Sequence, residues 1–265
     1  MKVQETARIL ANDWVSEEYF KIRLTCSSDY KDAVPGQFVT LRLPGQEEPL
    51  LRRPFSIHRL LTAGENALQM EILYRVVGGF TRRLSRQAPE GLLDMLGPVG
   101  HGFTVSSHEQ PVVLAAGGIG VAPLVFLAER LKHAGTDMSL VTIFLGGLTK
   151  TDILCDEIFS GQGAKVSVAT EDGTAGVKGL VTDPLNHWLE KNSPAMIYAC
   201  GPHAMLKAVG AIAKSRDIPC EVSIETLMAC GLGVCMGCAV SAGDTEKGYR
   251  HVCKDGPVFD AKVLV

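Results

Sequence analysis

A change of hydrophobic period near residue 102 is the feature that most constrains the fold. Before it, apolar and polar residues alternate in short runs that glycine- and proline-containing segments separate. The clearest runs are YFKIRLTC (19–26), QFVTLRL (37–43) and ALQMEILYRVV (67–77). Alternation with a period of two, punctuated by turn residues, is typical of antiparallel strands with one buried face. Residues 1–104 are therefore predicted to form an antiparallel β-barrel or sandwich domain.

After residue 102, continuous apolar runs alternate with segments of helical periodicity. The apolar runs are PVVLAA (111–116), SLVTIFLGG (139–147), AKVSVAT (164–170) and AMIYACG (195–201), and the helical segments are 122–133, 152–160, 180–190 and 203–215. Strands buried on both faces read as continuous apolar runs, and their alternation with helices indicates an α/β fold. Residues 105–222 are predicted to form a doubly wound parallel sheet. A last strand, CEVSIE (220–225), then leads into a small C-terminal domain, residues 223–265.

Charge and hydropathy exclude two classes of partner. The chain carries 26 Lys and Arg against 29 Asp and Glu, a net charge of −3, and no block of five like charges, so no nucleic acid partner is expected. The uncharged run 111–128 reaches the length of a membrane span, but three glycines and Pro123 interrupt it. A buried strand followed by a buried helix explains this run better. The N-terminus lacks the features of a signal peptide, so we expect a cytoplasmic protein with reduced thiols.

Four cysteines have the spacing of an iron–sulfur site. Cys230, Cys235 and Cys238 are spaced C-x4-C-x2-C, and Cys253 follows after fourteen residues. This is the plant-type [2Fe–2S] spacing, in which four thiolates hold two irons. The glycines between them allow the tight backbone that such a loop needs. Two alternatives remain open: a zinc site, although zinc sites usually have two C-x2-C pairs, and unbound cysteines.

The segment LAAGGIGVAP (114–123) places Gly118 and Gly120 between a predicted strand and a predicted helix. Backbone N–H groups at such a helix N-terminus can receive a pyrophosphate. Pro123 stands where a third glycine would complete the fingerprint, and no acidic residue directly follows the second strand. The glycines predict a nucleotide site, with a tight strand–helix turn as the alternative, and they leave open whether a 2′-phosphate is accepted.

A second candidate site lies in the first part of the chain. The segment RRPFSI places Arg52 and Arg53 beside a proline that fixes the backbone, and Ser56 follows. An arginine here can clamp a phosphate, and the serine can donate a hydrogen bond to a ring. The alternative is an edge strand with two solvated arginines.

Seven motifs in order carry a resemblance to a known family. They are RRPFS (52–56), YRVVGGFTRRL (74–84), LGPVGHGF (96–103), GGIGVAP (117–123), ATEDGTAGVKGLVTD (169–183), ACGP (199–202) and the cysteine loop. Over nearly its whole length the chain resembles the ferredoxin-NADP reductase superfamily. Within it, the chain is most similar to the electron-transfer subunits of dihydroorotate dehydrogenase B.

This resemblance implies an FAD-binding barrel, an NAD-binding domain and a [2Fe–2S] domain. It implies flavin contacts from Arg53, Pro54, Phe55, Ser56, Leu73, Tyr74, Arg75, Phe80 and Thr81, and NAD contacts from Gly118, Gly120, Cys200, Gly201 and Pro202. The chain departs from the family at Phe80, which replaces the glycine of a phosphate-binding Gly-Thr pair. A buried strand-end thiol is the alternative for Cys200.

The resemblance also implies a partner, an FMN-containing dihydroorotate dehydrogenase catalytic subunit, in a heterotetramer of two plus two. Electrons would pass from dihydroorotate to that FMN, then to the cluster, FAD and NAD⁺, in pyrimidine biosynthesis. The cofactors carry this chemistry, so no catalytic acid–base set is expected in the chain. The alternatives are a subunit of another flavin/iron–sulfur NAD(P)H reductase and a non-enzymatic redox-sensing or zinc-stabilised binding protein.

Overall fold

The first part of the fold is a curled antiparallel sheet. The computed structural model describes residues 2–45, 50–63, 67–242 and 248–264. Seven strands pair in the order β4-β3-β7-β1-β2-β6-β5. Their bounds are β1 Val3–Ser16, β2 Tyr19–Thr25, β3 Phe38–Arg42, β4 Arg53–Ser56, β5 Arg59–Ala63, β6 Ala67–Arg75 and β7 Leu92–Val99. The sheet curls until β4 meets β6, where the Phe55 and Tyr74 rings lie edge to face at 6.0 Å between centroids. The predicted antiparallel barrel is confirmed as a half-barrel.

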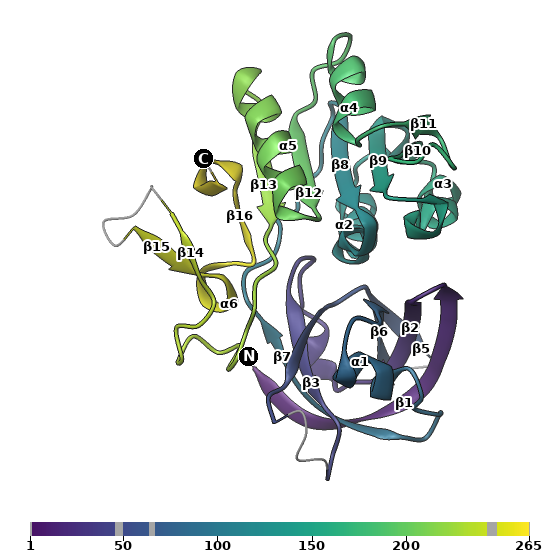
Figure 1. The fold of residues 1–265 in the computed structure, drawn as a ribbon, viewed down its shortest axis with the longest axis vertical. Coiled ribbons are helices and arrows are strands. Elements are labelled where there is room, and N and C mark those ends of the chain that lie inside the picture. Colours follow the sequence, from purple (N-terminus) through teal and green to yellow (C-terminus); the bar gives the residue numbers. More distant parts are fainter. Residues whose placement is uncertain (1, 46–49, 64–66, 243–247, 265) are drawn as a thin grey trace.

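The second part is the predicted parallel sheet, in the order β11-β10-β9-β8-β12-β13-β16. Its strands are β8 Val112–Gly117, β9 Val141–Gly147, β10 Lys165–Thr170, β11 Val177–Lys178, β12 Met196–Cys200, β13 Cys220–Ser223 and β16 Val258–Asp260. All neighbours pair in parallel except β13 and β16. The strand order reverses between β8 and β12, which is where such sheets bind ligands. Figure 1 shows this sheet above the half-barrel.

Helices cover both faces of the parallel sheet, as doubly wound topology requires. They are α2 Val121–His133, α3 Asp156–Gln162, α4 Thr182–Leu189 and α5 His203–Ser215, while the short α1, Gly79–Leu84, belongs to the half-barrel. Along β8, Val112 and Leu114 pack in the core with α2 and α3, whereas Val113 and Ala115 pack in the core with α4 and α5. The uncharged run 111–128 is therefore a buried strand and helix, as expected. No helix in the described residues is long and apolar enough to cross a membrane.

One predicted helix begins later than expected. The segment 152–160 is divided into a 3₁₀ turn, Lys150–Asp152, and α3, which begins at Asp156. The Asp152 carboxylate accepts the N–H groups of Leu148 and Thr149, at 3.0 and 3.3 Å, and so closes the turn. Cys155 then takes a left-handed conformation, φ 64°, which interrupts the helical path. Side chain–backbone bonding thus overrides the apolar periodicity here.

The C-terminal part packs beside both sheets (Figure 1). It contains β14 Ala239–Ser241, β15 Tyr249–His251 and α6 Val252–Asp255, and its strand β16 extends the parallel sheet. The loop after β7 joins it to the half-barrel, because His101 donates its N–H to the carbonyl of Gly256 at 2.6 Å. Cys238 and Cys253 lie in the same core as Phe38 of the half-barrel. The three parts of the chain therefore share contacts around this loop.

Candidate functional site

The first cavity, about 540 Å³, opens at the carboxyl ends of β8, β9 and β12. Predicted residues that line it are Gly118, Gly120, Gly201 and Pro202. Gly118 has φ +50°, and a Cβ on Gly120 would lie only 2.2 Å from the carbonyl oxygen of Cys200. These glycines therefore let the β8–α2 turn pass directly over the end of β12. The predicted nucleotide loop and the ACGP segment form one surface.

Cys200 itself lies beneath that surface. Its side chain is 1% exposed and is not among the residues lining the first cavity. Burial raises the pKa of the Cys200 thiol, and the nearby charge of Glu225 raises it further. This position agrees with a buried strand-end thiol, and contact with a nicotinamide stays a prediction.

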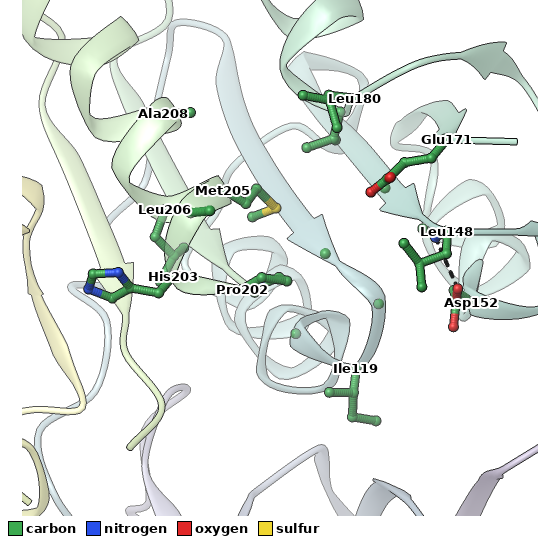
Figure 2. A pocket seen from close by; sticks show the side chains of 18 of the residues that line it. Ile119, Leu148, Asp152, Glu171, Leu180, Pro202, His203, Met205, Leu206 and Ala208 are labelled. Atoms are coloured by element: carbon green, nitrogen blue, oxygen red, sulfur yellow. Dashed lines mark hydrogen bonds between the residues drawn. The ribbon is translucent and has the colours of Figure 1, made fainter. Parts of the chain in front are cut away.

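One end of the first cavity carries an acidic residue that the sequence pattern did not reveal. Figure 2 shows Glu171 between the exposed side chains of Leu148 and Leu180. Glu171 directly follows β10, the third strand of the parallel sheet, and β10 lies beside β9, the second strand. Glu171 therefore reaches the place where an acidic residue directly after the second strand would lie. The signal was TEDG at the end of a predicted strand. Lys150 follows β9 and could in principle meet a 2′-phosphate, but it is not among the residues lining this cavity.

The half-barrel closes one side of the first cavity through a residue that sequence reasoning missed. Tyr19 of β2 lines the cavity and donates its hydroxyl hydrogen bond to Asp152 at 2.6 Å. Burial raises the pKa of the Tyr19 hydroxyl, and the hydrogen bond to the Asp152 carboxylate raises it further. Arg75 lies over the Tyr19 ring, 5.6 Å from its centroid, and pairs with Glu18 at 3.1 Å. These contacts fix the half-barrel against the loop that follows β9.

A second cavity, about 500 Å³, lies between the half-barrel and the segment after β13. The predicted flavin residues that line it are Arg53, Pro54, Phe55, Ser56, Leu73, Tyr74, Arg75, Phe80 and Thr81. The segment after β13 contributes Glu225, Thr226 and Met228 to the opposite wall. The structure therefore brings together every residue that the resemblance assigned to the flavin.

The two adjacent arginines have different partners. Arg52 forms an ion pair with Asp94 of β7 and is absent from the lining of the second cavity. Its guanidinium holds the pKa of Asp94 below its usual range, against the opposing effect of burial. Arg53 lines the cavity and donates to the carbonyl of Leu51 at 2.8 Å. Of these two adjacent arginines, only Arg53 lines the second cavity and could meet a phosphate there.

The departure at Phe80 has a packing explanation. Phe80 is 5% exposed, and its ring lies 6.0 Å from that of Phe55. It therefore fills the half-barrel core, and the backbone around it is the helix α1. The Thr81 hydroxyl accepts the N–H groups of Val77 and Gly78, at 2.9 and 3.0 Å. Thr81 thus shapes the turn before α1.

The four predicted cluster cysteines lie in two close pairs. Cys238 and Cys253 are buried, with their sulfurs 3.2 Å apart. The thiol of Cys235 hydrogen bonds to Cys230, whose sulfur also accepts the N–H groups of Leu232 and Cys235, at 3.3 and 3.4 Å. Burial raises the pKa of the Cys230 thiol, but the hydrogen bonds to its sulfur outweigh burial and lower the pKa to about 6.

This pairing matches the thiolate donors of a two-iron cluster. A [2Fe–2S] cluster shares four thiolates between two irons, so two pairs are the donor set that it needs. The N–H groups aimed at Cys230 favour its thiolate, the form that ligates iron. The cysteines therefore fit a [2Fe–2S] cluster.

The cysteine loop adjoins the second cavity through a short segment. From Met228, which lines that cavity, only one residue separates the chain from Cys230. A Cβ on Gly231 would lie 3.0 Å from Thr40 of β3, so the loop packs on the half-barrel. Three apolar side chains in or next to the loop are exposed: Leu227, Val234 and Met236, at 90%, 79% and 54%.

Comparisons with known proteins agree with this geometry. A family model described as the iron-sulfur cluster binding domain of dihydroorotate dehydrogenase B matches residues 225–265, and an oxidoreductase NAD-binding domain matches 114–211. The solved structure of an NADH-dependent reduced ferredoxin-NADP oxidoreductase superposes with a TM-score of 0.83 at 30% identity, covering 97% of this chain and 88% of that one.

Two curated relatives match over their full length. The electron transfer subunit of dihydroorotate dehydrogenase B (NAD(+)) from Desulforamulus reducens is 39% identical over 98% of this chain and 97% of its own. Its counterpart from Geobacillus sp. (strain WCH70) is 35% identical over 100% of both chains. The chain therefore belongs to the family of electron transfer subunits of dihydroorotate dehydrogenase B.

Proposed function

We propose that the second cavity holds FAD, the first cavity holds NAD(H), and the four cysteines hold a [2Fe–2S] cluster. The chain is then the NAD-linked electron transfer subunit of a dihydroorotate dehydrogenase. When bound, FAD exchanges a hydride with the nicotinamide and single electrons with the cluster. The proposed units are residues 1–104 for FAD, 105–222 for NAD and 223–265 for the cluster.

One observation carries this proposal: the two cavities share a wall. Arg75, Ile119, Ile224 and Glu225 line both cavities. Hydride transfer requires the two rings to touch, which only cavities with a common boundary allow. The apolar Ile119 and Ile224 exclude water from this boundary and so protect the transferred hydride.

We assign the flavin contacts to the β4 and β6 segments. Arg53 faces the second cavity and supplies a positive charge for the pyrophosphate. Ser56 supplies a hydroxyl at the same cavity wall, and no hydrogen bond to another described residue engages it. Thr81 holds the turn before α1 in shape through its bonds to Val77 and Gly78.

We infer that the first cavity prefers NAD(H) over NADP(H). Gly118 and Gly120 supply the close approach for the pyrophosphate, and Gly201 and Pro202 line the same surface. Glu171 at the far end is suited to accept hydrogen bonds from a ribose diol. The same carboxylate would repel a 2′-phosphate, and Arg75 is the sole Lys or Arg lining the cavity among the described residues.

The partner surface is proposed to lie on the outer side of the cysteine loop. Leu227, Val234 and Met236 are exposed apolar residues in or next to the cysteine loop, and Cys235 is exposed as well. Electron transfer subunits need a catalytic partner close to the cluster, and exposed apolar residues of this kind mark protein interfaces. We propose that an FMN-containing catalytic subunit docks here, in a heterotetramer of two plus two in the cytoplasm.

Spectroscopy combined with a mixing assay tests this function. The purified chain should show flavin and [2Fe–2S] absorption together and should reduce a dye with NADH. Dihydroorotate oxidation coupled to NAD⁺ should appear only after the catalytic subunit is added. On this assignment both cavities hold cofactors, so turnover of dihydroorotate by the chain alone would refute the proposal.

A further inference from the structure

The wall between the two cavities contains one acidic side chain, and its position gives it a specific role. Of the four residues that line both cavities, Arg75 is cationic, Glu225 is acidic, and Ile119 and Ile224 are apolar. Glu225 lies two residues after the end of β13, on the segment that continues to the cysteine loop. Figure 2 shows Ile119 extending from the β8–α2 turn toward the half-barrel, at the same boundary.

The two charged residues of the wall differ in their surroundings. Arg75 is neutralised by Glu18, with 3.1 Å between Nη2 and Oε2, and it covers the Tyr19 ring. For Glu225, the structure records neither a hydrogen bond nor an ion pair with another described residue. Its side chain is exposed to the cavities, and desolvation by the surrounding protein raises the pKa of the carboxyl. The anionic form therefore lacks a partner within the described chain.

A cationic ring in the first cavity would provide that partner. The nicotinamide ring is positively charged in NAD⁺ and neutral in NADH. On the proposed assignment of the two cavities, this ring must reach the shared wall to meet the flavin. Ile224 is 2% exposed and Ile119 is half-buried, so two of the four wall residues are apolar, and charges beside them interact more strongly than in water.

We propose that Glu225 is a specificity-determining residue that favours the oxidised, cationic nicotinamide over the reduced, neutral one. The inference rests on the proposed NAD(H) site and extends it to the redox state of the nucleotide. When the ring accepts a hydride it loses its positive charge, so the attraction to Glu225 ends and NADH is released more easily. A subunit that delivers electrons to NAD⁺ benefits from this difference because product inhibition is reduced.

Binding measurements separate the charge of the ring from its shape. The FAD- and cluster-containing chain is titrated by calorimetry at pH 8 with NAD⁺ and with 1,4,5,6-tetrahydro-NAD, whose ring is neutral and cannot donate a hydride. The variants are Glu225→Gln, Glu225→Asp and the control Glu190→Gln. Glu190 follows α4, pairs with His187 at 3.3 Å and lines neither cavity. Flavin absorbance checks that each variant retains FAD.

We expect Glu225→Gln to weaken NAD⁺ binding about tenfold, equivalent to about 1.4 kcal/mol, and to change the affinity for the neutral analogue less than twofold. Glu225→Asp should keep most of the NAD⁺ preference, and Glu190→Gln should change neither constant. Equal losses for both ligands, or no loss for NAD⁺, would overturn the inference. If Glu225→Gln does not retain FAD, Glu225→Asp decides the question. An unchanged preference of Glu225→Asp for NAD⁺ over the neutral analogue supports the role of the charge, and a lost preference overturns it. If the wild-type chain bound neither ligand, the proposed nucleotide site itself would be wrong.

Discussion

Replacing Gly120 by alanine tests whether the β8–α2 turn must pass directly over β12. An added Cβ would lie 2.2 Å from the carbonyl oxygen and 2.5 Å from the carbonyl carbon of Cys200. Ordinary contact begins at 3.4 Å, so the two backbones must separate by about 1.2 Å. Overpacking of a buried site costs about 1–3 kcal/mol, and alanine recovers about 0.5–1 kcal/mol of backbone entropy. We expect a net loss of about 1–2 kcal/mol, or a melting temperature lower by about 2–8 °C.

The same displacement should reduce nucleotide affinity, because the loop and the ACGP segment form one wall of the first cavity. Calorimetric titration of the FAD-containing chain with NAD⁺ should show at least a tenfold weaker binding in Gly120→Ala. Gly161→Ala in α3 is the matched control, since nothing lies within 4 Å of its Cβ. That variant should melt at the same temperature or slightly higher and bind NAD⁺ normally. A Gly120→Ala protein that behaves like Gly161→Ala would refute the reasoning.

Three further outcomes follow from the site. Arg53→Ala should lose FAD at low flavin concentration, since losing a charge-assisted contact costs about 2 kcal/mol. The control Arg52→Ala breaks the ion pair with Asp94 and should retain FAD. Equal flavin absorbance of the two variants after gel filtration would contradict the assignment. Cys238→Ala should remove about two irons per chain, and Cys26→Ala should remove none, as iron and sulfide analysis will show. Glu171→Gln should raise kcat/KM for NADPH relative to NADH in dye reduction by about tenfold, and an unchanged ratio would exclude Glu171 from ribose selection.

The elements that follow a single periodicity were predictable from the sequence. The segment 203–215 is the helix α5 with the same bounds, and the uncharged run 111–128 is a buried strand and helix. The helix predicted over 152–160 begins only at Asp156, because Asp152 bonds to the backbone and Cys155 leaves the helical region. Periodicity records which face is buried, but it does not record a competing side chain–backbone bond.

Residues defined by the order of strands were not predictable. Glu171 follows the third strand of the parallel sheet and reaches the first cavity only because β10 lies beside β9. Tyr19 belongs to the half-barrel, yet it bonds to Asp152 in the 3₁₀ turn after β9, across 133 positions of sequence. Glu225 lies between two motifs and belongs to neither. The position of each residue depends on how distant parts of the chain pack together, and local sequence patterns do not predict that packing.

The segment between β13 and the cysteine loop explains why the cluster site follows the nucleotide sheet in sequence. β13 ends at Ser223, and the next residues line both cavities before the chain reaches Cys230. A parallel strand delivers its carboxyl end to the ligand edge of the sheet. The chain that leaves this edge lines the second cavity, so the first cysteine pair lies next to that cavity without a separate linker. The antiparallel β16 then returns the chain to β13 and anchors the loop at both ends.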